Sequence, residues 1–102
     1  MQATEQMKRD LATDGAIVVR GLFSPEQLKR ARECFDYGIA HPSPQAKRVY
    51  AGTPDEHFNE YGNPENIEQY LALIDELGLA DFVSALWDSE HVWFLGEELF
   101  IK

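Results

Sequence analysis

The sequence predicts an α+β fold in which helices pack on a partial antiparallel sheet. Capping residues followed by apolar side chains at helical spacing indicate helices that begin near Ser24 and Asn63. Runs of β-branched and aromatic residues at 16–20 and 91–102 predict strands. A hydrophobic content of 44% and an aromatic content of 12% are too high for a disordered tail. We therefore expect residues 1–102 to form a single domain or a fragment of one.

The first expected element is a short helix over residues 4–12, followed by a strand. Met7 and Leu11 lie four positions apart, and the Asp-Gly turn signal at 14–15 ends the helix. The strand at 16–20 lies between two glycines and is apolar on both faces over three positions. It is therefore expected to be covered on both sides.

The second helix has the clearest local signals in the chain. Ser24 is placed as the N-cap, Pro25 as the first helical residue and Gln27 as the partner that completes a capping box. Gly38 and the proline-rich stretch 41–44 are expected to end the helix. Its apolar stripe consists of Leu28, Ala31, Phe35 and Ile39.

The stretch 41–62 contains three prolines and two glycines and is expected to be a long connection without regular structure. Asn-Pro at 63–64 opens the next helix, which Gly78 ends. A shorter helix is expected over 79–87, with a turn at 88–90. The buried face of the longer helix is expected to consist of Ile67, Tyr70, Leu71, Ile74 and Leu77.

The last segment, 91–102, is expected to be a strand or a strand pair with a bulge or tight turn at Gly96. Apolar side chains occupy both of its faces, which is typical of an interior strand with layers on both sides. In this chain those layers are missing, so we expect an open edge that forms a homo-oligomer, most simply a twofold dimer.

Charge is distributed unevenly. Residues 1–51 carry six acidic and eight basic side chains, whereas residues 52–102 carry twelve acidic side chains and Lys102 alone. The net charge of −9 argues against nucleic acid and against an anionic membrane as partners. No apolar run is long enough for a membrane span and no secretion signal is recognisable, so we expect a cytoplasmic protein.

The chain offers few side chains for catalysis or metal binding. A facial triad needs a carboxylate two residues after a histidine, and His41, His57 and His91 are followed at that distance by Ser43, Asn59 and Trp93. The single cysteine, Cys34, falls inside a predicted helix and is expected to be a buried structural thiol. No glycine-rich phosphate loop is present. We therefore expect no catalytic residue and no metal ligand in this chain.

Two stretches carry a resemblance to a known family. Residues 14–28 read DGAIVVRGLFSPEQL, and residues 91–102 read HVWFLGEELFIK. In this order and at this separation they resemble the N-terminal portion of phytanoyl-CoA dioxygenase-like proteins, in which a glycine-led strand enters a capped helix and a later strand ends in lysine. The stretch 63–87 fits the helical segment between them.

The resemblance implies the N-terminal part of a double-stranded β-helix, or jelly roll. That family holds Fe(II) with two histidines and one aspartate, takes 2-oxoglutarate as co-substrate and hydroxylates small molecules. Lys102 matches the strand-end lysine that contacts 2-oxoglutarate. The His-x-Asp, the distal histidine and the arginine that grips 2-oxoglutarate lie downstream in the family. This fragment is therefore expected to be inactive and to bind no cofactor.

Two alternatives stay open. The chain could be a binding or assembly module that keeps the scaffold without the metal site. It could also be an unrelated small α+β domain.

Overall fold

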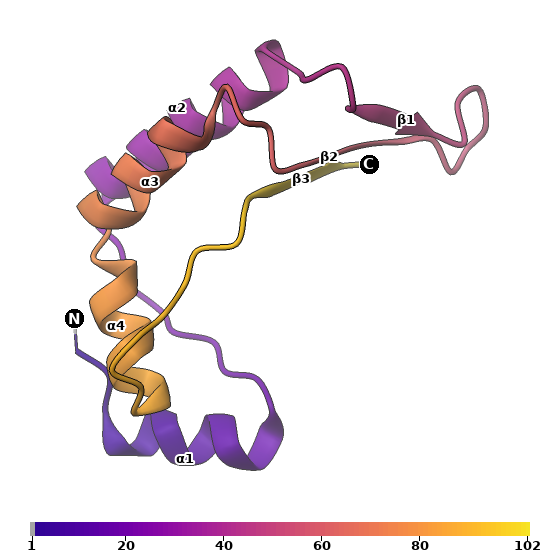
Figure 1. Ribbon diagram of the computed structural model, residues 1–102. Helices are drawn as coiled ribbons and strands as arrows, with labels where there is room; N and C mark the ends of the chain where they lie inside the picture. Colours follow the sequence, from indigo (N-terminus) through magenta and orange to yellow (C-terminus); the bar gives the residue numbers. More distant parts are fainter. Residues whose placement is uncertain (1) are drawn as a thin grey trace.

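The computed structural model describes residues 2–102, which form four helices and a three-stranded antiparallel sheet (Figure 1). The α+β class predicted from the sequence is confirmed. The elements in chain order are α1 (Glu5–Asp14), α2 (Pro25–Ala40), β1 (Lys47–Val49), β2 (His57–Tyr61), α3 (Ile67–Glu76), α4 (Leu79–Trp87) and β3 (Glu98–Ile101).

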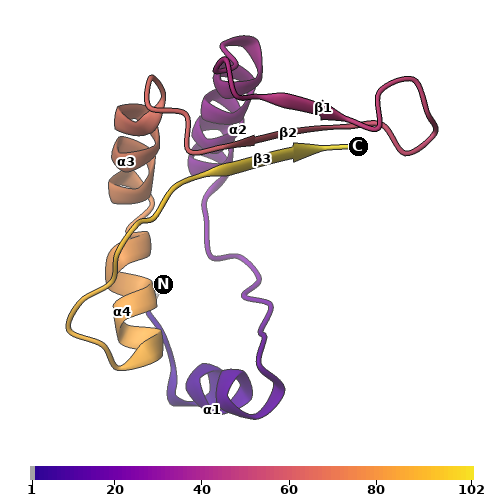
Figure 2. The same ribbon diagram turned by 45° about the vertical axis from the view of Figure 1, so that its right-hand side comes forward.

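The core lies where α2 and α3 meet the sheet. The two helices run side by side, and the strand order is β1-β2-β3, with β3 packed against α2 (Figures 1 and 2). The α1 helix contacts α4 at the opposite end of the molecule. The central cluster of buried side chains consists of Cys34, Tyr70, Leu73 and Leu99.

The start of α2 forms as its sequence predicts. Ser24 Oγ accepts a hydrogen bond from the Gln27 amide at 3.2 Å, and the Gln27 side chain accepts one from the Ser24 amide at 2.9 Å. The helix ends at Ala40, directly before the proline-rich stretch 41–44 that was expected to end it, but Gly38 lies within the helix and does not end it. Gly38 is buried instead, and its missing side chain leaves room for Tyr70 to pack closely on α2.

The strand expected at 16–20 does not form. These residues are irregular, and Val18 is 80% exposed. β-branched residues favour a strand only when a neighbouring strand and a packed layer are available, and the described chain places neither beside this segment. The preceding helix does form, with Thr4 as its N-cap and a left-handed Gly15 as its C-cap, and it ends two residues later than predicted.

The stretch 41–62, expected to be irregular, contains a β-hairpin. Strands β1 and β2 pair antiparallel with Arg48 opposite Phe58. The prediction failed because β1 is only three residues long and the prolines and glycines lie in the turns around the strands rather than within them.

The helical pair that follows is close to its prediction. The 79–87 helix is confirmed, while α3 begins at Ile67, three residues after the Asn-Pro pair that was expected to open it. Asn63 still organises the turn before α3, since its Oδ1 accepts from the Glu65 amide at 3.1 Å. The predicted buried face is shifted: Leu73 is buried, whereas Leu71 is 47% exposed.

The last strand is shorter than expected and lies at the edge of the sheet. Residues 91–97 are irregular, and only Glu98–Ile101 is a strand, paired on one side with β2. Leu99 is buried against α2, but Phe100 is 56% exposed, so the expected interior strand with cover on both faces is wrong for this chain. The physical reason is that no layer within residues 2–102 covers the second face of the sheet.

The molecule is elongated and open. Its radius of gyration is 16.0 Å, whereas about 13 Å is typical of a compact chain of this length. Its accessible surface is 7690 Å², whereas a compact monomer of 11.6 kDa exposes roughly 5,800 Å². About 1,900 Å² of surface is therefore exposed beyond what a self-contained domain would show.

Candidate functional site

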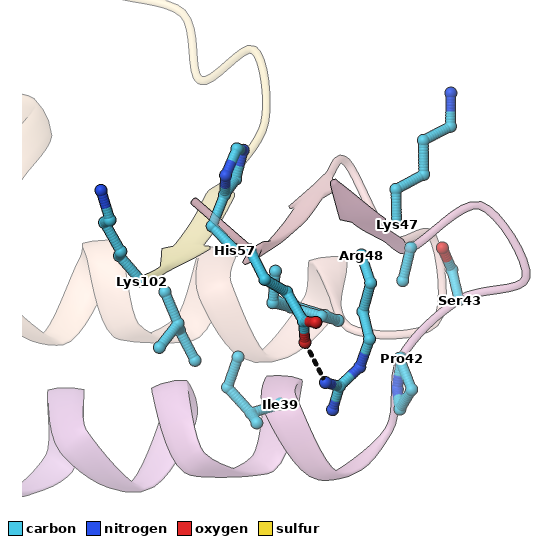
Figure 3. A pocket seen from close by; sticks show the side chains of 11 residues that line it. Ile39, Pro42, Ser43, Lys47, Arg48, His57 and Lys102 are labelled. Atoms are coloured by element: carbon cyan, nitrogen blue, oxygen red, sulfur yellow. Dashed lines mark hydrogen bonds and ion pairs between the residues drawn. The ribbon is translucent and has the colours of Figure 1, made fainter. Parts of the chain in front are cut away.

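A hollow of about 560 Å³ lies between the end of α2 and the outer end of the sheet (Figure 3). Ile39 from α2 and Phe58 and Ile101 from the sheet form its apolar wall. The strand register explains this wall, because Arg48, Phe58 and Ile101 lie opposite one another on three neighbouring strands and so share one face. The hollow is half apolar and carries one ion pair.

That ion pair joins Arg48 to Glu56 at 2.7 Å. The other oxygen of Glu56 accepts a hydrogen bond from the Gly52 amide at 2.7 Å. This backbone bond, and after it the bond from Arg48, lowers the pKa of Glu56 below its ordinary value. The carboxylate thus helps to close the β1–β2 turn, with one oxygen bonded to Arg48 and the other to the Gly52 amide.

Lys102, the residue that the resemblance assigns to 2-oxoglutarate, borders this hollow but does not point into it. Figure 3 shows Lys47, His57 and Lys102 directed away from α2, on the face of the sheet opposite Ile39. Lys102 Nζ lies 3.8 Å from Asp55 Oδ1, and both side chains are largely exposed. Two further cations border the same hollow, Lys47 and Arg48, and Arg48 is paired with Glu56.

Two of the three histidines, His41 and His57, are engaged in local contacts. His41 stacks on Tyr37 with ring centroids 3.9 Å apart, and its Nδ1 lies 2.9 Å from the Tyr37 carbonyl oxygen. His57 Nδ1 lies 3.0 Å from the carbonyl oxygen of Asp55, and its ring packs on Phe100. Among residues 2–102 no three His, Cys, Asp or Glu side chains gather closely enough to hold a metal ion. The described residues do not fit an Fe(II) site.

A buried polar cluster that the sequence reasoning missed lies at the other end of the sheet. Glu60 is 2% exposed and accepts from the Ser43 amide at 2.6 Å, while Glu97 is 9% exposed and accepts from the Asn63 amide at 2.8 Å. Asn63 in turn donates to the His41 carbonyl at 3.0 Å. These bonds tie together the three connections that enter β1, α3 and β3.

Tyr70 lies near this cluster, and its hydroxyl donates to the Cys34 carbonyl oxygen at 3.4 Å. Burial, and after it the negative charge of Glu97, raises the pKa of the Tyr70 phenol above its ordinary value. One oxygen of each glutamate has no hydrogen-bond partner within residues 2–102, nor has the side chain of Asn66. A signal was present in the sequence: Phe58 and Glu60 are two residues apart, so any strand there places them on the same face.

The second surface of interest is the exposed side of the sheet with the segment that leads into β3. Trp93 is 84% exposed, Leu95 is 85% exposed and Phe100 is 56% exposed. Exposed apolar side chains of this size are candidates for contact with another protein layer.

Comparisons with protein-family models, with curated proteins and with solved structures found no match to this chain. The family resemblance of residues 14–28 and 91–102 therefore stays a prediction. Within residues 2–102, none of the helices combines the length and the apolar character that crossing a bilayer requires.

Proposed function

We propose that this chain is the N-terminal scaffold portion of an Fe(II)- and 2-oxoglutarate-dependent oxygenase similar to the phytanoyl-CoA dioxygenases. In its full-length form the protein hydroxylates a small molecule in the cytoplasm. The residues described here provide a helical layer and the first strands of the sheet. On their own they are catalytically inactive.

The observation that carries this proposal is the position of β3. This strand, which Lys102 follows, lies at the edge of an antiparallel sheet. One of its apolar faces packs on α2 and the other is exposed. A jelly roll is built by adding antiparallel strands to such an edge and a second sheet to such a face. The surface excess of about 1,900 Å² supports the same interpretation, since a scaffold without its remaining layers exposes more area than a complete domain.

Fe(II) chemistry is assigned to residues outside the described chain. His41, His57 and His91 are separated and none has a carboxylate at ligand spacing, so the 102-residue chain should bind no Fe(II) with useful affinity. Anaerobic titration with Co(II), followed by its visible absorption, measures this directly. A stoichiometric site of micromolar affinity would overturn both this assignment and our interpretation of the histidines.

A binding or assembly module is the second candidate, favoured by the exposed edge of β3. The two candidates differ in what the coding DNA contains after codon 102. An in-frame His-x-Asp a short distance downstream supports the oxygenase. A stop codon at that point supports the module.

A further inference from the structure

The free edge of β3 has a defined set of unpaired backbone groups. The Gly62 amide donates to the Glu97 carbonyl at 2.9 Å, which extends the β2–β3 register by one pair. Hydrogen-bonded pairs alternate along an antiparallel ladder, so Leu99 and Ile101 direct their backbone groups toward β2. The amides and carbonyls of Glu98, Phe100 and Lys102 therefore point away from β2, toward the open edge.

We propose that this edge pairs with the same edge of a second copy of the chain, antiparallel and centred on Phe100. In that register each residue faces its counterpart across a twofold axis: Phe100 faces Phe100, Leu99 faces Ile101, and Glu98 faces Lys102. The three outward-pointing residues all become hydrogen-bonded, giving about six backbone bonds across the axis. The two sheets join into one continuous sheet.

Charge complementarity selects the second copy and this register. The segment runs from an acidic residue, Glu98, to a basic one, Lys102, with apolar residues between them. Antiparallel self-pairing centred on Phe100 therefore places a carboxylate opposite an ammonium at both ends. Moving the centre to Leu99 would place Glu98 opposite Phe100 and lose both ion pairs. In the register centred on Phe100, no two residues of like charge face each other.

The exposed surface area is large enough for contact with a second copy of the chain. A standard interface takes roughly 800 Å² from each partner, and this chain exposes about 1,900 Å² more than a compact monomer. The Phe100 side chain, 56% exposed, lies on the sheet face away from α2 and would meet its counterpart beside the axis. This inference concerns the free edge of β3 in the 102-residue chain, and it differs from the oxygenase proposal, which places later strands of a jelly roll at the same edge.

Sedimentation equilibrium of the 102-residue chain tests the dimer. We expect a monomer–dimer equilibrium at high micromolar concentration that shifts toward dimer as salt rises. Each copy carries a net charge of −9, and salt screens that long-range repulsion more strongly than it screens ion pairs in contact. A strict monomer at every salt concentration would overturn the proposal.

A charge exchange tests the register. Glu98→Lys alone or Lys102→Glu alone places like charges opposite each other at both ends and should weaken dimerisation by about tenfold. An equimolar mixture of the two variants restores both opposite-charge pairs and should recover the wild-type affinity as a heterodimer. Circular dichroism of each variant controls for folding. If the mixture associates no better than the separate variants, the proposed register is wrong.

A proline substitution tests the edge itself. Phe100→Pro removes an amide that points away from β2, so it should abolish the dimer and leave the β2–β3 pairing intact. Ile101→Pro is the matched control, because its amide lies in the ladder with β2 and its loss should destabilise the fold. A folded Phe100→Pro chain that still dimerises would show that another surface forms the contact.

Discussion

Two regions of the molecule obey the same local rules but differ in how they are packed. The core region consists of α2, α3 and the sheet, and it buries Cys34, Tyr70, Leu73 and Leu99 as one cluster. The base consists of α1, residues 15–24 and α4. Its largest buried side chain is Phe82, and among the described residues α1 buries none.

Helix capping does not explain this difference. The α1 helix has an N-cap, Thr4, that accepts from the Met7 amide at 3.2 Å, and a left-handed C-cap at Gly15. The α2 helix has an N-cap of similar quality and a complete capping box. Local signals therefore place both helices, whereas burial depends on whether another layer lies against them. In the base, Val18 and Trp87 are exposed because no such layer covers them within residues 2–102.

The substitution with the largest expected effect on stability tests how tightly the core region is packed. An alanine Cβ at Gly38 would lie 2.6 Å from the Tyr70 hydroxyl and 2.8 Å from Leu99 Cδ1. Gly38→Ala should therefore lower the free energy of unfolding by about 1–3 kcal/mol, although alanine is the better helix former. Urea denaturation measures this change.

Two control variants sharpen the Gly38 test. In a Tyr70→Phe background the nearest clashing atom is gone, so the cost of Gly38→Ala should fall. Thr13→Ala, on the exposed surface of α1, should change stability by less than about 0.5 kcal/mol. If Gly38→Ala is as harmless as Thr13→Ala, then the core region is as loosely packed as the base.

A second, smaller effect concerns the junction between the two regions. Ser24 Oγ accepts from the Gln27 amide where residues 15–24 enter α2. Ser24→Ala should lower the free energy of unfolding by about 0.5–2 kcal/mol. Ser43→Ala should have a smaller effect, because it removes a loop bond from the Gln45 amide to Ser43 Oγ rather than a helix cap, and the bond to Glu60 comes from the Ser43 backbone amide. Equal losses in urea denaturation of the two variants would contradict the capping role of Ser24.

Sequence reasoning predicted the helices better than the strands, for a physical reason. A capping box such as that of Ser24 and Gln27 is complete within four residues, so the sequence alone contains all of it. The strands depend on partners far along the chain: β2 pairs with β3 across about 40 residues, and the β-branched run at 16–20 remains irregular without a partner.

The candidate site shows the same difference between features set by local sequence and features set by distant partners. The apolar character of Trp93 and Phe100 is visible in the sequence, but their exposure is not, because alternation predicted an interior strand with cover on both faces. The one signal for Glu60, its place on the same strand face as Phe58, required a strand that was not predicted. The burial of Glu97 had no signal, because it arises where three connections cross, and only the fold brings those connections together.

The smallest expected effect on stability comes from the contact that holds α1 to the rest of the base. Lys8 lies 2.5 Å from Asp88 and 3.1 Å from Glu5. The hydrogen bond that the Lys8 ammonium donates to Asp88, and after it the one that it donates to Glu5, raises the pKa of Lys8 above its ordinary value of 10.5. Because a raised lysine pKa favours the folded state while the lysine is charged, this contribution is complete below pH 10.5 and is lost as pH rises through the folded-state pKa.

Asp88→Asn should therefore lower the pKa of Lys8 more than Glu5→Gln does, as measured by NMR titration of the Lys8 side chain. Asparagine tolerates the left-handed backbone of Asp88, whose φ is 50°, so the turn after α4 should be preserved. Amide hydrogen exchange should become faster in α1, which contacts the other helices through α4, and should stay unchanged around Leu73 in α3. If exchange also becomes faster around Leu73, the base and the core region unfold as one unit. The looser packing of the base would then not make it less stable than the core region.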